Sequence, residues 1–220
     1  MAMRSSATPM SLAGSVVHDT RHVCAFFNDE EEEYRVLLPF VTEGFARGEK
    51  AVHVIEADRS HDHLQRLALS GIDAHGAAER GQLEVRSTAE VYLRDGRFDV
   101  DRMLATFDRL ASGNAHRPFP RSRIVCRMGW AAGSRALVDA VIEFESRVND
   151  VWRKHDDVVV CTYPLAQLTG DAVVDILRTH PAVIIGGLLQ RNPFFIPPAD
   201  FLPEIRRRRL ASARESDGGA

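Results

Sequence analysis

The side chains best suited to chemistry lie in and just beyond apolar segments that read as strands, at 22–27, 51–55, 123–127 and 158–161. Ligands of open parallel sheets bind at the carboxyl ends of the strands, so we expect these side chains to line one pocket. An apolar lining with a few polar groups is typical of a site for a small organic molecule, although the same aromatics could simply form the upper layer of the core. The predicted ligand-binding residues are His22, Cys24, Phe27, Asn28, Asp58, Arg127, Met128, Trp130, Cys161 and Tyr163.

The turn after the first of these strands lacks the features of a phosphate site. Asn28 and Asp29 are followed by four glutamates, where a phosphate loop would have glycines and a lysine. The nearest match to that loop, GFARGEK at 44–50, has the wrong spacing and lies at the end of a predicted helix, where the helix dipole disfavours phosphate. The sequence therefore predicts a nucleotide-binding scaffold without its phosphate cradle.

Metal binding and catalysis have weaker signals. His22 and Cys24 share one face of the first predicted strand and are the weak metal or haem candidates. Further histidines and cysteines that could join or form such a site are His18, Cys126 and Cys161, and the pair His61 and His63. Closely spaced cysteine pairs are absent, so we predict no metal and no cofactor. No nucleophile elbow appears, so we predict no catalytic residue and no enzyme.

The composition fits a soluble protein that avoids membranes and nucleic acid. The 220 residues are 45% hydrophobic and 27% charged, with a net charge of −3. That balance gives no long-range attraction to nucleic acid or anionic lipid. No apolar run approaches the ~20 residues of a membrane helix. Three cysteines without paired spacing indicate reduced thiols and a cytoplasmic location.

The elements that must position these residues alternate between strand and helix. Strands are predicted at 22–27, 51–55, 83–86, 123–127, 158–161 and 182–185, and helices at 30–47, 60–69, 90–93, 99–111, 136–154, 170–180 and 200–209. Pro39 should kink the first helix. This order predicts an α/β fold, with a mostly parallel sheet between two layers of helices. The expected division is a flexible leader at 1–17, one domain at 18–205, and a basic, then disordered tail at 206–220.

A series of segments, taken in order, resembles one known family. It runs from HVCAFF at 22–27 and EEEEY at 30–34, through RMGWA at 127–131 and VVVCTYP at 158–164, to THPAVIIGG at 179–187 and NPFFIPPADFL at 192–202. The chain thereby resembles the MEDS domain, a sensory domain named for methanogen and methylotroph proteins and for the dichloromethane-responsive repressor. The resemblance implies a RecA/KaiC-like fold with a degenerate phosphate loop, and sensing of small hydrocarbon derivatives in bacterial signal transduction and transcription regulation.

The resemblance also implies characteristic positions. They are His22, Cys24, Glu31, Glu32, Met128, Trp130, Glu145, Asn149, Cys161, Tyr163, His180 and Pro181. Two positions depart from the family pattern: Arg127 stands where an acid is common, and Phe27 where tyrosine is common. A cation at Arg127 would change the charge of the pocket and could admit an anionic ligand.

The function expected from the residues and the resemblance together is a stand-alone sensory or regulatory domain. It would bind a small organic ligand and signal through a partner protein, such as a kinase or regulator, because 220 residues leave no room for an output module. A homodimer is also compatible with the sequence. The alternatives are a degenerate KaiC-like nucleotide-binding ATPase, and a pure protein-interaction module in a sigma-factor or kinase cascade.

Overall fold

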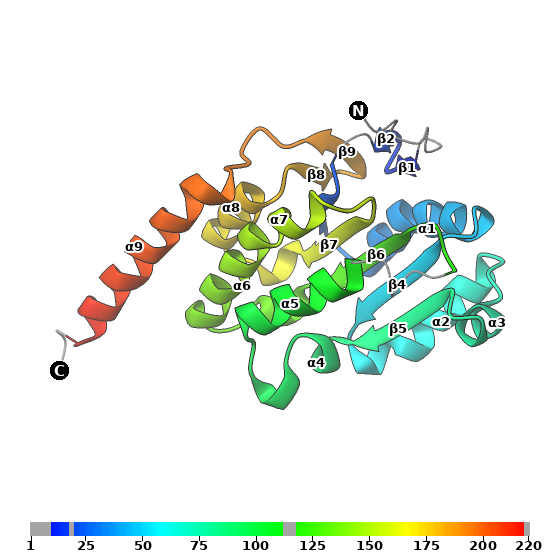
Figure 1. Cartoon of the computed structure of the whole chain (residues 1–220), viewed down its shortest axis with the longest axis horizontal. Helices are drawn as coiled ribbons and strands as arrows, with labels where there is room; N and C mark the ends of the chain where they lie inside the picture. Colours follow the sequence, from blue (N-terminus) through cyan, green and yellow to red (C-terminus); the bar gives the residue numbers. More distant parts are fainter. Residues whose placement is uncertain (1–9, 18–19, 112–117, 218–220) are drawn as a thin grey trace.

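A mostly parallel sheet runs through the centre of the molecule (Figure 1). The computed structural model describes residues 10–17, 20–111 and 118–217. Within these residues the sheet has seven strands in the order β5-β4-β6-β7-β3-β8-β9, and all neighbours are parallel except β8 and β9. The strands are β3 (His22–Phe27), β4 (Lys50–Ile55), β5 (Leu83–Ser87), β6 (Ser122–Arg127), β7 (Val158–Pro164), β8 (Ala182–Ile185) and β9 (Leu188–Arg191).

Helices cover both faces of this sheet, which confirms the predicted three-layer α/β fold (Figure 1). One face carries α1 (Glu30–Ala46), α2 (Ser60–Leu69) and α3 (Ala74–Glu79). The other carries α4 (Thr88–Val91), α5 (Val100–Ala111), α6 (Arg135–Arg147), α7 (Asn149–Trp152) and α8 (Gly170–Thr179). Short 3-10 turns follow four of the elements: η1 (Ala57–Arg59), η2 (Arg94–Gly96), η3 (Gly129–Ala131) and η4 (Leu165–Gln167).

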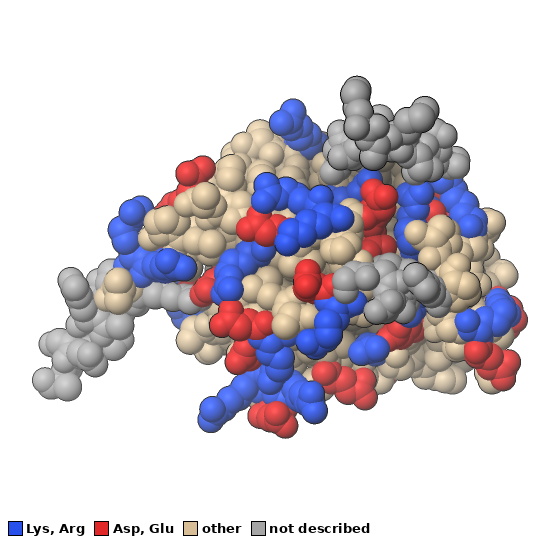
Figure 2. Space-filling view, viewed as in Figure 1, with Lys and Arg blue, Asp and Glu red and all other residues tan. Residues whose placement is uncertain are grey.

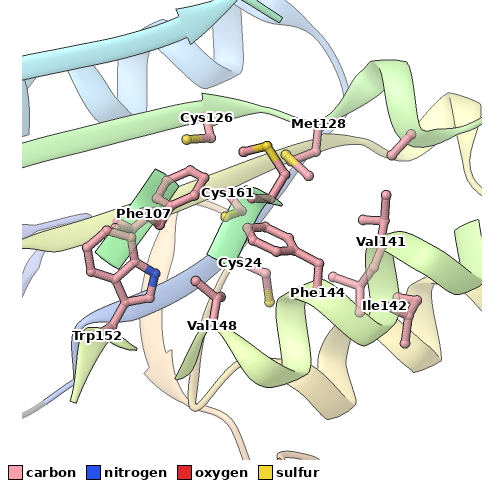
Figure 3. Packing of buried hydrophobic residues seen from close by; sticks show 14 of the residues in the cluster. Cys24, Phe107, Cys126, Met128, Val141, Ile142, Phe144, Val148, Trp152 and Cys161 are labelled. Carbon is pink, nitrogen blue, oxygen red and sulfur yellow. The ribbon is translucent and has the colours of Figure 1, made fainter. Parts of the chain in front are cut away.

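Side chains alternate across the sheet and fill two separate apolar layers. In β3, Cys24 and Phe26 face the layer beneath α6, whereas Ala25 and Phe27 face the layer beneath α1. Figure 3 shows the first layer, to which β7 adds Cys161 opposite Cys24. Two side chains that are neighbours in the sequence therefore lie on opposite sides of the sheet. This alternation decides which predicted site residues can meet.

Two predicted elements differ from the structure near the site. The helix predicted at 136–154 is two helices, because it ends at Arg147 and a new turn begins at Asn149. The Asn149 amide donates to the carbonyls of Glu145 and Ser146, at 2.9 and 3.0 Å, and so takes over acceptors of the last turn of α6. The strand predicted at 158–161 continues to Pro164, because β3 supplies parallel partners as far as Phe27.

Residues 10–17 correct the expectation of a flexible leader. They form a hairpin of β1 (Met10–Leu12) and β2 (Ser15–Val17). Its two-residue turn has positive φ at both Ala13 and Gly14, as hairpin geometry favours. The side chains of Met10 and Leu12 are 2% and 1% exposed and join the apolar layer beneath α1. Burial of these two side chains explains why the segment is folded.

The C-terminal segment also differs from the expected tail. A long helix, α9 (Pro198–Asp217), includes most of residues 206–220 and projects from the body of the molecule (Figure 1). Its first turns are anchored by Phe201 and Ile205, which are buried in the layer shared with α6. At the other end of the chain, α1 continues through Pro39 as one helix. Among the described residues, no helix has the length and apolar character that a membrane span requires.

Candidate functional site

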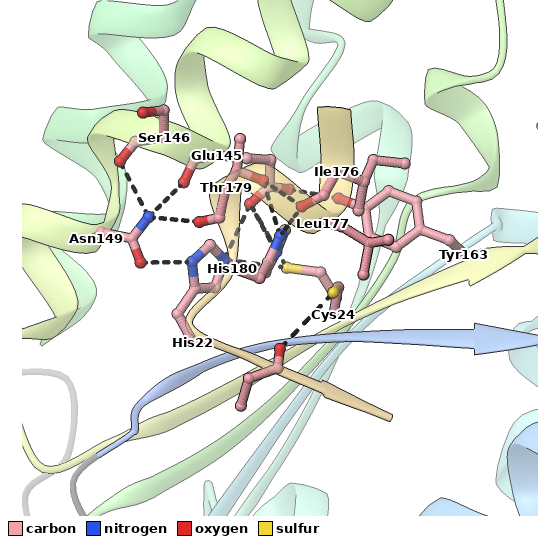
Figure 4. A network of polar contacts seen from close by, with 12 residues as sticks. His22, Cys24, Glu145, Ser146, Asn149, Tyr163, Ile176, Leu177, Thr179 and His180 are labelled. Atoms are coloured by element: carbon pink, nitrogen blue, oxygen red, sulfur yellow. Dashed lines mark hydrogen bonds and ion pairs between the residues drawn. The ribbon is translucent and has the colours of Figure 1, made fainter. Parts of the chain in front are cut away.

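Four polar side chains meet in the layer between the sheet and α6. We call them the buried cluster: His22 of β3, Glu145 of α6, Cys161 of β7, and His180, which follows α8. Figure 4 labels the two histidines and Glu145. None of the four is more than 3% exposed. Glu145 Oε2 lies 2.9 Å from Nε2 of His22 and 3.5 Å from Nε2 of His180. Cys161 Sγ lies 3.6 Å from His22 Nε2 and 3.8 Å from Glu145 Oε2.

The fold brings these residues together from distant parts of the chain. Strands β3 and β7 are neighbours whose register pairs Cys24 with Cys161, so His22 and Cys161 face the same side of the sheet. The inward face of α6 places Glu145 above them. His180 has extended backbone angles, φ −118° and ψ 125°, as expected for a residue that precedes a proline. Its ring packs against that of His22, with the centroids 4.0 Å apart.

Hydrogen bonds around the buried cluster determine which nitrogen of each imidazole ring carries the proton. The Asn149 amide donates to three carbonyls, including Thr179 O at 2.8 Å, so its Oδ1 faces His22 Nδ1 as an acceptor at 3.2 Å. His180 Nδ1 lies 2.9 Å from the carbonyl of Ile176, which can only accept. Each Nδ1 therefore carries the proton, and each Nε2 points its lone pair toward Glu145.

Burial and neighbouring charges shift the pKa values in the buried cluster. Burial, followed by the nearby His180 ring, lowers the pKa of His22, so this ring is neutral near pH 7. Burial raises the pKa of the Cys161 thiol well above its usual value, and the Glu145 carboxylate adds to this effect. Burial alone would raise the pKa of Glu145, but the contacts of its carboxylate with His180 and His22 outweigh burial and hold that pKa below the usual range.

A cavity of 170 Å³ lies beside the buried cluster, at the carboxyl ends of β6 and β7. It is bounded by the start of α6, by α8, and by the segments that follow the two strands. Its lining is Ala131, Ala132, Gly133, Val138, Val141, Ile142, Tyr163, Gln167, Leu168, Thr169, Ala172 and Ile176. Most of these residues are apolar, and those with polar side chains are Tyr163, Gln167 and Thr169.

Tyr163 connects the cavity to the buried cluster. Its ring lines the cavity, and its hydroxyl donates to Glu145 Oε1 at 3.0 Å. Ile176 makes a second connection, because its side chain lines the cavity while its carbonyl accepts from His180. A molecule that displaced the Tyr163 ring would therefore disturb the hydrogen bond to Glu145.

Comparison with known proteins decides the family. The model of the family described as MEDS, the MEthanogen/methylotroph, DcmR Sensory domain, matches residues 21–181. The chain belongs to the MEDS family. This membership supports the sensory or regulatory role that the sequence leads us to expect. A comparison with curated proteins finds no match.

A solved structure supports the expected fold of the MEDS domain. It is a KaiC-like protein from the hyperthermophilic archaeon Pyrococcus horikoshii OT3, with a TM-score of 0.52 and 15% sequence identity. The similarity covers 74% of this chain and 70% of that one. At this identity the likeness concerns the fold alone, and it confirms the RecA/KaiC-like architecture.

The structure of the MEDS domain brings together only some of the predicted ligand-binding residues. Tyr163 lines the cavity, and His22 and Cys161 belong to the buried cluster beside it. Cys24 lies nearby on the same face, where its thiol donates to the carbonyl of Ala182 at 3.7 Å. His22 and Cys161 do not line the cavity themselves; they contact Glu145, which is bonded to the Tyr163 hydroxyl.

Met128 and Trp130 belong to the core of the MEDS domain beneath α5 and α6 rather than to the lining of the cavity. Met128 is fully buried. The Trp130 ring stacks on Tyr92, with the centroids 4.8 Å apart, and also contacts Phe98 at 5.3 Å. Both residues therefore belong to the upper layer of the core, which was the alternative to a pocket lining.

Arg127 and Phe27 lie on the opposite face of the sheet, beneath α1. The Arg127 guanidinium forms ion pairs with Glu33 and Glu30, each at 3.0 Å, and with Glu56 at 3.6 Å. Its charge is therefore balanced by acids of the MEDS domain itself. The expectation that Arg127 would change the charge of the aromatic pocket does not agree with this placement, because side chains alternate across β6 and Arg127 points away from the cavity.

The turn between β3 and α1 is closed by its own carboxylates. The backbone N–H and the side-chain amide of Asn28 both donate to Glu32 Oε2, at 2.8 and 2.9 Å. Asp29 Oδ1 accepts the N–H of Glu32 at 2.8 Å, as the sequence spacing predicts for a helix cap. The backbone N–H groups of Asn28 and Glu32 are thus bonded to carboxylates, whereas a phosphate at a helix N-terminus would need such groups as donors. Asp58 lies in η1 and is exposed to solvent.

A second histidine group lies in the layer beneath α1. His63, rather than His61, is buried, and its Nε2 lies 2.7 Å from His53 Nδ1. The Tyr34 hydroxyl lies 2.7 Å from His63 Nδ1. The predicted pair of His61 and His63 is not brought together, because His61 is on the exposed side of α2. His18, another weak metal candidate, lies outside the described residues.

Reasoning from residue types missed most of the cavity lining. The segment 165–169 comes directly after the carboxyl end of β7, so the rule that singled out Tyr163 could have included Gln167 and Thr169. Glu145 and His180 were indicated only by the family resemblance. No short spacing connects them to His22 or Cys161, so only the three-dimensional fold reveals the buried cluster.

Proposed function

We propose that this MEDS domain senses a small, uncharged or weakly polar organic molecule that binds in the cavity between α6 and α8. The observation that carries the proposal is the position of the cavity: it lies at the carboxyl ends of two central parallel strands, where ligands of such folds bind. The family membership agrees with a sensory role.

The size and lining of the cavity define the class of ligand. A water molecule occupies about 30 Å³ in the liquid, so 170 Å³ has room for only a small molecule. Pockets for drug-sized ligands measure about 300–1,000 Å³. The side chains of Val138, Ile142 and Leu168 favour an apolar body, while the Tyr163, Gln167 and Thr169 side chains can hydrogen-bond one polar group. Short alcohols and halocarbons fit this description, and methylamines and small acids, which are charged near pH 7, complete the screen as contrasting probes.

The acidic turn supports the same ligand class over a nucleoside triphosphate. The N–H groups of Asn28 and Glu32, at the start of α1, are occupied by the carboxylates of Glu32 and Asp29, and the four glutamates that begin α1 would repel phosphate. Arg127 is a cation close to this turn, but it is engaged by three carboxylates. A nucleotide would have to displace these interactions in order to bind there.

A route from the cavity to a partner protein runs through α8 and α9. Ala172 and Ile176 of α8 line the cavity. On the same helix, Asp175 pairs with Arg208 of α9 at 2.7 Å, and Arg178 donates to Glu204 of α9 at 2.8 Å. A shift of α8 on ligand binding would therefore move α9, which projects from the body (Figure 1). We propose that a partner protein binds α9 and responds to this movement.

The surface charge fits a protein partner better than nucleic acid. Figure 2 shows acidic and basic side chains interspersed over the face formed by α5, α6 and α7. The net charge of the chain is −3. Neither feature provides the extended basic patch that binds nucleic acid by electrostatic attraction. The proposal therefore expects no direct nucleic-acid contact.

Filling the cavity should abolish ligand binding. A screen of thermal shifts against the small molecules named above is expected to find a ligand that raises the melting temperature by roughly 5–10 °C at about 100 times its dissociation constant. The Ala172→Leu variant places three extra carbon atoms in the cavity, at a cost of about 1–3 kcal/mol in stability. This variant should melt in one cooperative transition but show no shift with the ligand.

The matched control is Ala68→Leu, the same substitution on the exposed face of α2. It should keep the full thermal shift. ATP with magnesium should give no shift in any of the proteins. A screen without a single hit, or a hit whose shift survives in Ala172→Leu, would contradict binding in this cavity.

A further inference from the structure

We propose that the buried cluster is a closed, four-coordinate zinc site. The ligand atoms would be His22 Nε2, Glu145 Oε2, Cys161 Sγ and His180 Nε2. These four atoms all lie within 4.8 Å of one another. Zinc is commonly bound by such nitrogen, sulfur and oxygen ligands, with bonds of about 2.0–2.3 Å. Small side-chain movements would bring the four atoms around one ion.

Protons alone do not satisfy the buried cluster. Both imidazole rings donate their Nδ1–H to groups outside the cluster, namely Asn149 Oδ1 and Ile176 O. Both Nε2 lone pairs therefore face the Glu145 carboxylate. A proton on one Nε2 could bond to the carboxylate, but it would make that ring a cation. The rings of His22 and His180 lie 4.0 Å apart, so both cannot readily be charged in a buried site. The other Nε2 lone pair then has no donor, apart from the weak Cys161 thiol at 3.6 Å from His22 Nε2.

The Nε2 atom of His180 is the clearest case of an unsatisfied lone pair. Its side chain is fully buried, and its Nε2 has no hydrogen-bond partner among the described residues. Such an atom is costly unless a further group satisfies it. A metal ion satisfies both Nε2 lone pairs and the carboxylate oxygen at once.

Three of the four ligands have the supporting hydrogen bonds that metal ligands require. A histidine that binds a metal usually donates its other ring N–H to a carbonyl or carboxylate. Here His22 donates to Asn149 Oδ1, and His180 donates to Ile176 O. Glu145 is oriented by Tyr163, whose hydroxyl donates to the other carboxylate oxygen at 3.0 Å.

The charges favour a divalent ion. Zn²⁺ would be neutralised by the Glu145 carboxylate and the Cys161 thiolate, with two neutral imidazoles completing the shell. Formation of the zinc–sulfur bond releases the thiol proton to solvent, and no oxidation or reduction occurs. The complete burial of the cluster leaves no open position for substrate, which indicates a structural rather than a catalytic site.

The sequence led us to predict no metal, although His22 and Cys161 were among its weak metal candidates. Three of its ligands lie at strands β3 and β7 and just before β8, and the fourth is on α6. The ion would therefore join α6 to the centre of the sheet. The proposal does not depend on a ligand in the neighbouring cavity.

Metal analysis of the whole chain, purified without chelators, tests the proposal. Stoichiometric zinc is expected, either as purified or after refolding with Zn²⁺. Removing the ion with a strong chelator should lower the melting temperature, and added zinc should restore it. Trace zinc under both conditions, together with a melting temperature that zinc and chelator leave unchanged, would overturn the proposal.

Cobalt substitution identifies the ligands. Co²⁺ in the site should give the intense near-ultraviolet absorption of a cobalt–thiolate bond. This band is expected to be lost in Cys161→Ser and kept in Cys24→Ser, the control thiol on the same face. A band that persists in Cys161→Ser would overturn the assignment of the sulfur ligand.

Tyr163→Phe provides a milder test that does not remove a ligand. Loss of the hydroxyl that orients Glu145 should weaken zinc binding by about 10–100-fold, measured by competition with a chelator of known affinity. An unchanged affinity in this variant would contradict the proposed role of Glu145 as a ligand. Circular dichroism establishes that each variant is folded before its metal affinity is measured.

Discussion

Replacing Arg123 by alanine is expected to lower the free energy of unfolding by about 3–5 kcal/mol. The Arg123 side chain is 1% exposed, and its guanidinium pairs with Glu49 and with Glu43, the latter at 2.8 Å. It also donates to the carbonyl of Phe40, so it joins β6 to α1. The alanine variant leaves the buried Glu49 carboxylate without this partner. For a domain of this size, the melting temperature should fall by roughly 6–20 °C.

A surface arginine provides the control. Arg153 pairs with Asp150, but the two side chains are 76% and 54% exposed. Arg153→Ala should therefore change stability by no more than about 1 kcal/mol. Denaturant unfolding of both variants measures the difference. Equal effects of the two substitutions would show that the buried ion pairs of Arg123 contribute little.

The domain is expected to lose stability as the pH falls from about 6.5 toward 4. Burial, followed by the charge of Arg127, lowers the pKa of His63 from its usual 6.5 to about 4. Burial, followed by His63, lowers the pKa of His53 well below its usual value. The unfolded chain therefore takes up protons at a higher pH than the folded chain does. The stabilisation is complete above pH 6.5, and for His63 about 3 kcal/mol of it is lost by pH 4.

The two histidines of α2 separate this effect from other titrations. Between pH 6.5 and 5, the loss of unfolding free energy should be smaller in His63→Gln than in the parent chain by about 2 kcal/mol. His61→Gln changes an exposed residue two positions away and should leave the dependence as in the parent chain. Unfolding curves recorded at several pH values test both variants. If His63→Gln kept the full slope, the acid sensitivity would have to come from other groups.

The central strands and their order of alternation with helices could be predicted from the sequence. The strand at 22–27 and the helix at 60–69 agree with β3 and α2 residue for residue. These segments are apolar runs or amphipathic stripes with clear ends, so local pattern and burial act in the same direction. The break at Asn149 was missed because it depends on carbonyls from two different helices, at Glu145 and Thr179.

The candidate site was predictable only in part. Placing residues at strand ends selected Tyr163, which lines the candidate cavity, but it also grouped side chains that the sheet separates. Arg127 directly precedes Met128 in the sequence, yet its side chain lies on the other side of the sheet among glutamates. Glycine patterns were equally ambiguous. Gly44 of the apparent phosphate-loop match instead leaves room for Arg123, whose Cδ would lie 2.7 Å from an added Cβ.

The central claim is that a small organic molecule binds between α6 and α8, and methyl NMR spectroscopy tests it most directly. With isotope-labelled valine, leucine and isoleucine, a screening hit should cause saturable shifts in the methyl signals of Val138, Ile142 and Leu168, which line the cavity. The signals of Val36 and Val85, beneath the opposite face of the sheet, should not move. Saturable shifts confined to that opposite face, or shifts near the start of α1 with ATP and magnesium, would contradict the account.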